Sequence, residues 1–311
     1  AQKHQSNNCV CSRTYGRHGY RLKNMVFEHA LSLSHPLRGY RWNNHANRSW
    51  YIPPRRTMAD YSVLMEKEGR IHVVEVVDEM VKYKGLGVIN TATLLANSNI
   101  GDEVLVGQKY LTIMPARLPE LISGMARRAQ TISAKDAGFF ITRLGIGAGD
   151  TVLEAGLGSG GLSLHLARVL GETGHLITAE PRDEHASVGL TNLQRASKCF
   201  SGFPRHTHLA GMVEDVVPDE EFNAIILDMP VHSPAITACA PKLAFGGRLA
   251  CYAPTTSQLE ACWKACEEAG LKVEWAGELM ERQWGLTSKG GMRPVNGPFG
   301  HTAFLLVAQK R

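Results

Sequence analysis

A glycine-rich loop between a strand pattern and a helix pattern constrains the fold more than any other feature of this sequence. Residues 151–155 form an apolar run typical of a buried strand, and residues 162–170 follow with helical spacing. The loop between them, residues 156–161, carries glycine at four of its six positions. Glycine lets the chain turn sharply and lets a ligand touch the backbone, so this unit predicts a cofactor site.

Strand and helix patterns continue to alternate after this loop. We expect further strands at residues 175–179, 222–227, 248–253, 271–281 and 302–308, and helices at residues 183–198 and 257–269. Strand and helix in turn predict an α/β fold, in which a mostly parallel sheet is covered by helices on both faces.

An acid follows the glycine loop at the distance that an adenosine-containing cofactor requires. Glu180 ends the next expected strand, 22 residues after Gly158. A carboxylate in this place can accept hydrogen bonds from both ribose hydroxyls of such a cofactor. The spacing of Gly156, Gly158 and Gly161 also satisfies the dinucleotide fingerprint, so a nicotinamide-dependent oxidoreductase is a competing interpretation.

Two features favour S-adenosylmethionine over a nicotinamide. Glu154 stands just before the first glycine, where a carboxylate could hold an ammonium group. The last apolar run, residues 302–308, follows a long loop, and we expect it to be a late strand inserted antiparallel. Such a strand is typical of methyltransferase sheets and not of dinucleotide-binding domains, whose sheets are built from parallel units.

A second candidate site lies where the apolar run of residues 222–227 ends. Asp228 follows this run directly, and Met229 and Pro230 come next. Open α/β sheets bind their ligands beyond the carboxyl ends of the strands, so we expect Asp228 beside the cofactor. An aspartate close before a proline can also simply start a turn, but the nearby glycine loop favours the functional interpretation.

The positive charge of the chain is concentrated at its front. The 311 residues carry a net charge of +5, yet residues 1–56 hold ten Lys or Arg against one acid, Glu28, which gives +9 in this segment. A basic, acid-poor segment is typical of an arm that contacts RNA phosphates, and equally of an organellar import extension. Cys9 and Cys11 lie near histidines but fit no usual zinc template, so no metal is expected.

Composition shifts divide the chain into three zones. We expect a basic extension at residues 1–56, a small β-rich domain at residues 57–118 and a cofactor-binding domain at residues 119–311. The middle zone holds short β-branched runs separated by glycines and polar residues. No run of about 18 apolar residues occurs, so we expect no transmembrane helix and no membrane partner.

The cysteines do not form a recognisable disulfide framework. There are seven in the chain, and an odd number argues against full pairing. A reducing compartment therefore fits the sequence best. Cys262 and Cys266 share one face of an expected helix, where we interpret them as core residues and not as ligands.

Four separated motifs together resemble the tRNA (adenine-N1) methyltransferases that modify position 58 in the T-loop. The motifs are residues 130–136 (QTISAKD), 149–160 (GDTVLEAGLGSG), 227–229 (LDM) and 300–305 (GHTAFL). The resemblance covers roughly residues 100–311 and implies a class I methyltransferase with a Rossmann-like seven-stranded sheet and a small N-terminal β domain. Residues 293–295 look most like the mitochondrial branch of this family.

The resemblance also implies a role for each matching residue. Asp228 matches the catalytic acid, which would accept a hydrogen bond from the exocyclic amino group of the target adenine. The implied cofactor contacts are Ile132, Glu154, Gly156, Gly158, Ser159, Gly160, Gly161, Leu162, Glu180, Gly211, Met212 and Asp228. Many family members carry aspartate where this chain has Gly211, and Glu214 is a candidate replacement.

The leading interpretation is an active enzyme that uses S-adenosylmethionine to methylate N1 of adenine in tRNA or rRNA. The alternative is a methyltransferase-like RNA-binding subunit of an organellar ribosome with little or no activity. The family implies a homotetramer or a hetero-oligomer with a sister subunit. A mitochondrial location is expected, with the cytoplasm or nucleus as the alternative.

Overall fold

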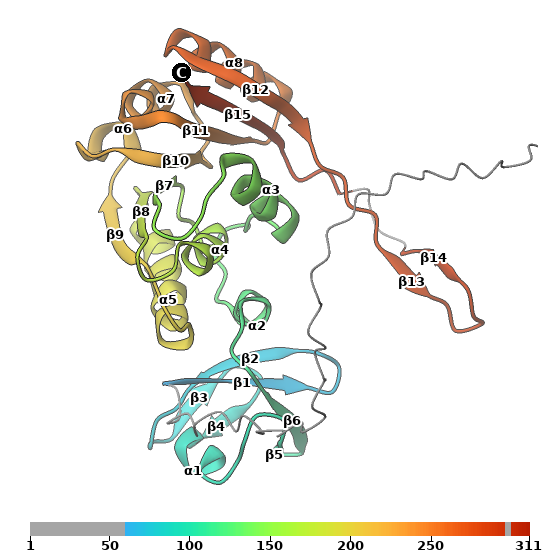
Figure 1. Ribbon diagram of the computed structural model, residues 1–311. Coiled ribbons are helices and arrows are strands. Elements are labelled where there is room, and N and C mark those ends of the chain that lie inside the picture. Colours follow the sequence, from blue (N-terminus) through green and yellow to red (C-terminus); the bar gives the residue numbers. More distant parts are fainter. Residues whose placement is uncertain (1–59, 296–299) are drawn as a thin grey trace, which may run out of the picture. The chain divides into compact units, whose positions relative to one another are not determined.

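The computed structural model describes residues 60–295 and 300–311, which all belong to one compact unit spanning residues 54–311 (Figure 1). The expectations for the basic extension, including Cys9 and Cys11, therefore lie outside the described residues. The division of the remaining chain near residue 118 separates two sheets, each of which has its own buried core.

A seven-stranded mixed sheet forms the centre of the second half of the chain. Its strands are β7 (Thr151–Ala155), β8 (His175–Glu180), β9 (Arg205–Ala210), β10 (Phe222–Leu227), β11 (Leu243–Ala253), β12 (Leu271–Glu278) and β15 (Phe304–Lys310). Their order is β12-β15-β11-β10-β7-β8-β9. Strand β15 lies antiparallel between β11 and β12, while β11, β10, β7, β8 and β9 run parallel. The expected late antiparallel strand is thus confirmed.

Helices cover both faces of this sheet because successive strand residues point to opposite sides. Val152 and Ile226 pack in one core with α3 (Ala134–Leu144), α4 (Gly161–Leu170) and α5 (Asp183–Cys199). Leu153 and Ile225 pack in the other core. That core includes α6 (Val213–Val216), α7 (Ser233–Cys239), the short 3-10 helix Ala240–Lys242 and α8 (Thr256–Glu268) (Figure 1).

A separate four-stranded antiparallel sheet precedes the large one. It contains β1 (Tyr61–Glu66), β2 (Ile71–Glu75), β5 (Glu103–Val106) and β6 (Lys109–Met114) in the order β2-β1-β6-β5. Between β2 and β5 lie the hairpin of β3 (Val81–Tyr83) and β4 (Gly87–Ile89) and the helix α1 (Thr91–Leu95). Leu64, Val74 and Leu111 are fully buried in its core. The small β-rich zone is therefore present as expected.

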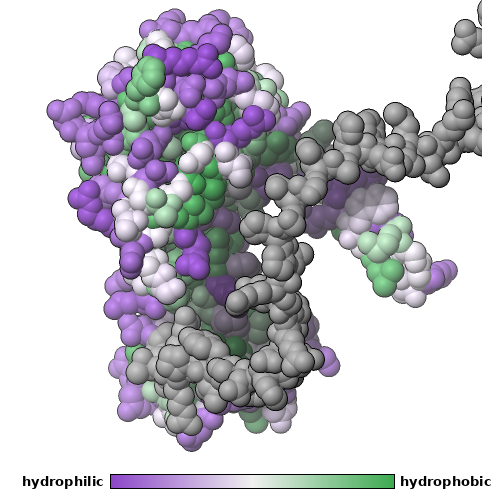
Figure 2. Space-filling model, viewed as in Figure 1, coloured by the Kyte–Doolittle hydropathy of each residue, from purple (hydrophilic) through white to green (hydrophobic). Residues whose placement is uncertain are grey.

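The helix α2 (Leu118–Gly124) leads from the small sheet into the large one. It packs closely against β2, because a side-chain carbon built on Gly124 would lie 2.6 Å from Cγ2 of Val73. Further along the chain, β13 (Trp284–Leu286) and β14 (Met292–Pro294) pair in a two-stranded ribbon. Trp284, Leu286 and Met292 are exposed on this ribbon, where Figure 2 shows an apolar patch.

Among the described residues, none of the helices combines the length and the apolar character that crossing a bilayer demands.

Candidate active site

The glycine loop and Asp228 lie together because their strands are neighbours. Strands β7 and β10 pair in parallel, and the backbone N–H of Asp228 donates to the carbonyl of Ala155 at 2.8 Å. Gly156 follows with a φ of +91°, a conformation that favours glycine. A side-chain carbon at Gly156 would lie 1.9 Å from the backbone oxygen of Asp228. Only glycine therefore allows the loop and the end of β10 to approach this closely.

The segment of residues 128–132 is fastened over the same loop. The hydroxyl of Ser159 accepts hydrogen bonds from the backbone N–H groups of Arg128 and Ala129, both at 3.0 Å. A side-chain carbon at Gly161 would lie 2.8 Å from Cβ of Thr131, so this glycine also permits a close approach. The first two motifs identified in the sequence thus form adjoining walls of one site. The Ser159 hydroxyl holds residues 128 and 129 against the glycine loop.

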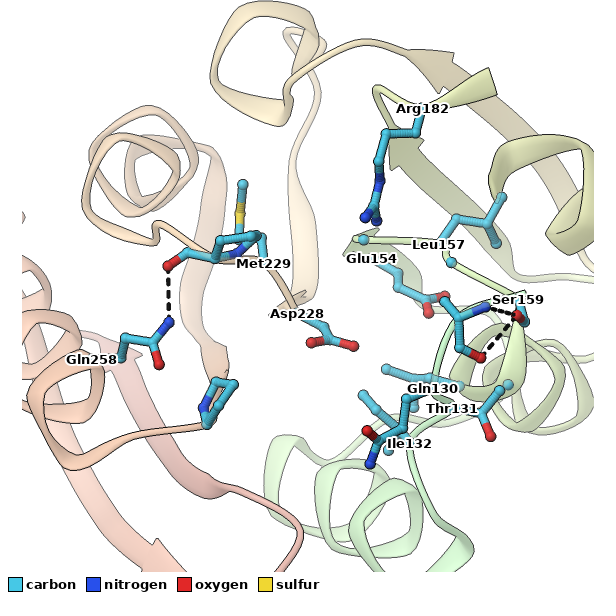
Figure 3. Close-up of a pocket in the computed structure, with 17 residues that line it drawn as sticks. Gln130, Thr131, Ile132, Glu154, Leu157, Ser159, Arg182, Asp228, Met229 and Gln258 are labelled. Carbon is cyan, nitrogen blue, oxygen red and sulfur yellow. Dashed lines mark hydrogen bonds between the residues drawn. The ribbon is translucent and has the colours of Figure 1, made fainter. Parts of the chain in front are cut away.

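These walls enclose a cavity of about 310 Å³, shown in Figure 3. Eight of the expected site residues line it: Ile132, Glu154, Gly156, Gly158, Ser159, Gly161, Leu162 and Asp228. The other lining residues are Ala129, Gln130, Thr131, Leu157, Arg182, Met229, Pro230, Pro254 and Gln258. Four expected residues, namely Gly160, Glu180, Gly211 and Met212, are not part of the lining.

Glu180 lies behind the cavity wall and is covered by Arg182. Its carboxylate is almost fully buried and accepts a hydrogen bond from the Gly158 N–H at 3.0 Å. Arg182 donates from Nε to Oε1 at 2.7 Å and from Nη2 to Oε2 at 3.2 Å. Burial raises the pKa of Glu180, but the hydrogen bonds from Arg182 and Gly158 outweigh it and hold the pKa below its usual value. Glu180 is therefore an ionised acceptor beside the glycine loop.

Two acids in the cavity have raised pKa values because the surrounding protein partly or wholly removes them from water. Burial raises the pKa of Glu154 to about 8, against an opposing hydrogen bond from Ser163 and with a further increase from the charge of Asp228. Burial likewise raises the pKa of Asp228 to about 6, while His232 opposes the shift. Figure 3 shows the carboxyl group of Asp228 projecting into the cavity. A buried carboxyl and a half-buried one in the same cavity make the site well suited to a cationic ligand, whose charge would lower both pKa values.

Gly211 and Met212 are expected to contact the cofactor, and the structure gives a reason why position 211 is not aspartate. Gly211 has a φ of +151°, and a side-chain carbon there would lie 2.6 Å from Cγ1 of Val216. Aspartate would therefore collide with α6 in this backbone arrangement. Oε2 of Glu214 is buried and has no hydrogen-bond partner among the described residues. The roles of Gly211, Met212 and Glu214 at the cofactor stay predictions.

Arg182, Pro254 and Gln258 were not identified as site residues from the sequence. The Nε2 group of Gln258 donates to the carbonyl of Pro230 at 3.0 Å and so ties α8 to the loop that carries Asp228. A signal for its position existed, because Thr255 and Gln258 have the spacing of a capping box, and the structure forms that box. Arg182 follows the expected ribose acid by two residues, but nothing local indicated that its side chain would turn back onto Glu180.

The antiparallel strand β15 places the sheet outside the dinucleotide-binding class, and the acids of the cavity fit a cationic cofactor. Together they define a class I, S-adenosylmethionine-dependent methyltransferase. The chain belongs to the family described as "tRNA methyltransferase complex GCD14 subunit", whose model matches residues 110–289.

Individual relatives agree with this assignment. A tRNA (adenine(57)-N(1)/adenine(58)-N(1))-methyltransferase TrmI of Methanocaldococcus jannaschii is 27% identical over 81% of this chain and 95% of its own length. A tRNA (adenine(58)-N(1))-methyltransferase TrmI of Thermus thermophilus is 28% identical, covering 80% of this chain and 96% of the relative.

Solved structures show the same fold. An S-adenosylmethionine-dependent O-methyltransferase of Thermotoga maritima superposes with a TM-score of 0.67 at 26% identity, covering 81% of this chain and 93% of the other. The tRNA (m1A58) methyltransferase TrmI of Aquifex aeolicus gives a TM-score of 0.61 at 21% identity, covering 81% and 97%. At 21% identity, the similarity to the A. aeolicus structure shows a shared fold.

Proposed function

We propose that this protein transfers a methyl group from S-adenosylmethionine to N1 of adenine 58 in the T-loop of tRNA. Membership of the tRNA methyltransferase family supports the reaction class. The printed names of the relatives from M. jannaschii and T. thermophilus, both of which include adenine 58, support the position. The observation that carries the proposal is the carboxyl group of Asp228, which lines the cavity beside the glycine loop.

The residues of the cavity fit the cofactor. Bound S-adenosylmethionine would supply a methyl group already activated on a sulfonium. Glu154 is the carboxyl best placed to hold its ammonium group, because it lines the cavity and has no cationic side chain among its interaction partners. The backbone of Gly156 and Gly158 permits close approach of the methionine portion. The ribose contact of Glu180 stays a prediction, because its carboxylate accepts a hydrogen bond from Gly158 and is covered by Arg182.

Asp228 would act on the adenine in two ways. Adenine N1 is a weak nucleophile in folded RNA, and taking the base out of its stack costs about a few kcal/mol. The Asp228 carboxylate would accept a hydrogen bond from the exocyclic amino group, which raises the electron density at N1. It would also stabilise the positive charge that develops on the ring. Correct placement of N1 against the methyl group supplies most of the remaining acceleration.

The alternative, a methyltransferase-like RNA-binding subunit of an organellar ribosome with little or no activity, is not supported. Such a subunit would have no need of acids in a cofactor cavity, yet Glu154 and Asp228 both line the cavity. The relatives reported above are all named as enzymes. A nicotinamide enzyme is disfavoured by the antiparallel strand β15.

The assembly and the location of the protein are part of the proposal. We infer a homotetramer or a complex with a sister subunit, since the family description speaks of a complex subunit. Light scattering of the purified chain distinguishes the two arrangements. We infer a mitochondrial location because residues 1–56 are basic and acid-poor, as import extensions are. Imaging of the protein with a C-terminal fluorescent fusion tests this location against the cytoplasm and nucleus.

The direct test of the activity is an assay with purified components. The protein is incubated with an unmodified tRNA transcript and S-adenosylmethionine, and the digested nucleosides are measured by mass spectrometry. We expect 1-methyladenosine to form with the cofactor and not with a nicotinamide. Binding of NAD without any response to S-adenosylmethionine would refute the proposal.

A further inference from the structure

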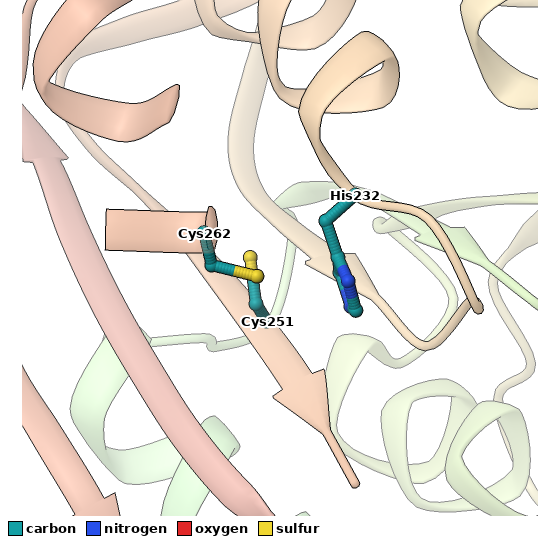
Figure 4. A group of neighbouring side chains, drawn as sticks. All are labelled: His232, Cys251 and Cys262. Carbon is teal, nitrogen blue, oxygen red and sulfur yellow. The ribbon is translucent and has the colours of Figure 1, made fainter. Parts of the chain in front are cut away.

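A histidine and two cysteines meet in the core beneath the proposed active site. His232 immediately precedes α7, Cys251 lies on β11 and Cys262 on α8. One ring nitrogen of His232 and the two sulfur atoms all lie within 4.8 Å of one another. The cysteines are 0% exposed and His232 is 4% exposed. Figure 4 shows both sulfur atoms close together with the imidazole beside them.

The hydrogen bond of His232 to a backbone carbonyl determines which ring nitrogen carries the hydrogen. Nε2 lies 3.2 Å from the backbone oxygen of Tyr252. A carbonyl oxygen can only accept, so Nε2 carries the hydrogen, and Nδ1 is the acceptor nitrogen of the neutral ring. Metal-binding histidines usually have this arrangement, in which one nitrogen donates to a carbonyl and the other binds the ion.

A further buried thiol lies beside Cys251. Cys266 is 0% exposed and follows Cys262 by one helical turn on the same face of α8. The thiol of Cys251 is within hydrogen-bonding reach of the thiols of both Cys262 and Cys266. Three cysteines and one histidine form one of the standard ligand sets of structural zinc sites.

The interpretation of Cys262 and Cys266 from the sequence, as core residues and not ligands, accounts for only part of this cluster. Free cysteine is often buried as a small hydrophobic residue, and Cys239 on α7 is an example in the same protein. An imidazole is different, because it is polar and needs hydrogen-bond partners when buried, which here are the carbonyl of Tyr252 and the thiol of Cys262. The imidazole and the thiols are thus already in contact, at the mutual distances at which they could share an ion once the thiols are deprotonated.

We propose that this cluster binds one zinc ion through His232, Cys251 and Cys262, with Cys266 as the fourth ligand. The ion would join the loop after β10 to β11 and α8. Asp228, Met229 and Pro230 of that loop line the cavity, and Gln258 of α8 already holds Pro230 by a hydrogen bond. The zinc would therefore stabilise the wall that carries Asp228, without touching the reacting atoms. This inference concerns metal content and does not depend on the proposed reaction.

The test measures zinc in the full-length protein. The chain is produced with added zinc, without a polyhistidine tag, and purified without oxygen or chelators. Elemental mass spectrometry should then find one zinc per chain. A double variant, Cys251→Ser with Cys262→Ser, should lose it. Cys239→Ser is the matched control for a buried cysteine and should retain the ion.

Two further measurements make the result decisive. The double variant Cys9→Ser with Cys11→Ser should keep its zinc, because the proposed ligands are elsewhere. Cobalt exchanged into the wild-type protein should produce the strong absorption of tetrahedral thiolate coordination, which does not require a cluster variant to fold. Wild-type protein without zinc and with all its thiols free would overturn the proposal, as would a disulfide between Cys251 and Cys262. Loss of zinc in the Cys9 and Cys11 variant would overturn it too.

Discussion

Glu154, which is buried, and Asp228, which is half-buried, have different tasks in one cavity. They reach it from the neighbouring strands β10 and β7, and burial raises the pKa of both. The lower pKa of Asp228, about 6, leaves it mostly ionised at neutral pH, as a hydrogen-bond acceptor for adenine must be. Glu154, with a pKa of about 8, is mostly protonated until a cation arrives.

Replacing the proposed catalytic carboxylate should remove activity without unfolding the protein. Asp228→Asn keeps the shape of the side chain but places an amide where adenine needs an acceptor. We expect kcat to fall by about 10²–10³, as is common when one stabilising group is removed. Methyl transfer to tRNA and calorimetric cofactor binding are measured together. The exposed acid Asp215 on α6 provides the control, Asp215→Asn, which should keep full activity. An unchanged rate in Asp228→Asn would remove this residue from the mechanism.

Cofactor binding should release a proton from Glu154. At pH 6.5 the free protein holds this group protonated, because its pKa is about 8. The positive cofactor lowers that pKa, so binding should release about one proton, and affinity should increase as the pH rises toward 8. Calorimetry in buffers with different ionisation enthalpies counts the protons. The neutral variant Glu154→Gln should release none from this position, and equal release by both proteins would contradict the assignment.

At the scale of elements, the sequence predicted the strands and helices that have a regular apolar pattern. It did not predict those whose bounds depend on pairing with other strands. The apolar runs of β7 and β10 and the helical spacing of α4 were sufficient to identify those elements and to place Asp228. Strand β9 was not predicted because its sequence, RHTHLA, does not alternate apolar and polar residues. The strand lies at the edge of the sheet. Strand β11 begins earlier than expected, at Leu243, because a bulge in its pairing with β10 interrupts the pattern.

The same limit applies to the site. Glycines and acids can be recognised by their spacing along the chain, so Gly156, Glu154 and Asp228 were identified. Arg182 covers Glu180 because its side chain folds back toward the end of β8. Gln258 contacts the loop after β10 from α8, and it follows its partner Pro230 by 28 residues. No local pattern encodes such interactions.

The requirement for glycine at position 156, where the loop lies against the end of β10, can be tested by adding one methyl group there. In Gly156→Ala the new carbon would lie 1.9 Å from the oxygen of Asp228, at a φ of +91°. Gly246→Ala is the matched control, since it has a φ of +82° but nothing within 4 Å. Both should be destabilised by about 1–2 kcal/mol of backbone strain.

Gly156→Ala should show a clearly larger decrease in Tm than this control, together with loss of cofactor binding. Thermal unfolding and calorimetry measure the two effects. Equal decreases in Tm with unchanged cofactor affinity would show that the loop does not need glycine at this position.

At the scale of the whole molecule, charge and chemistry belong to different parts of the chain. Residues 1–56 carry +9, so the remaining residues carry −4 in total. The glycine loop, Glu180 and Asp228 all lie beyond residue 150, within the compact unit of residues 54–311. Binding of RNA phosphates and methyl transfer should therefore be separable.

Deleting residues 1–56 should weaken RNA binding and reduce its dependence on salt. A basic side chain that neutralises a phosphate releases condensed counterions. The logarithmic salt slope should therefore decrease by about 0.7 for each single-strand phosphate that the shortened protein no longer neutralises. Binding of S-adenosylmethionine should be unchanged. Fluorescence anisotropy with labelled tRNA at several salt concentrations measures the slope. If affinity and slope are the same with and without the segment, the segment serves import or protein docking and not RNA.

The most direct test of the account is the transfer of a labelled methyl group to a single position in tRNA. The purified protein is given methyl-labelled S-adenosylmethionine and either an unmodified tRNA transcript or the same transcript with guanine at position 58. We predict that the label appears as 1-methyladenosine in the T-loop fragment of the first transcript, and in neither transcript when Asp228→Asn replaces the wild-type protein. Label in the transcript that lacks adenine 58, or no transfer to either RNA, would contradict the account.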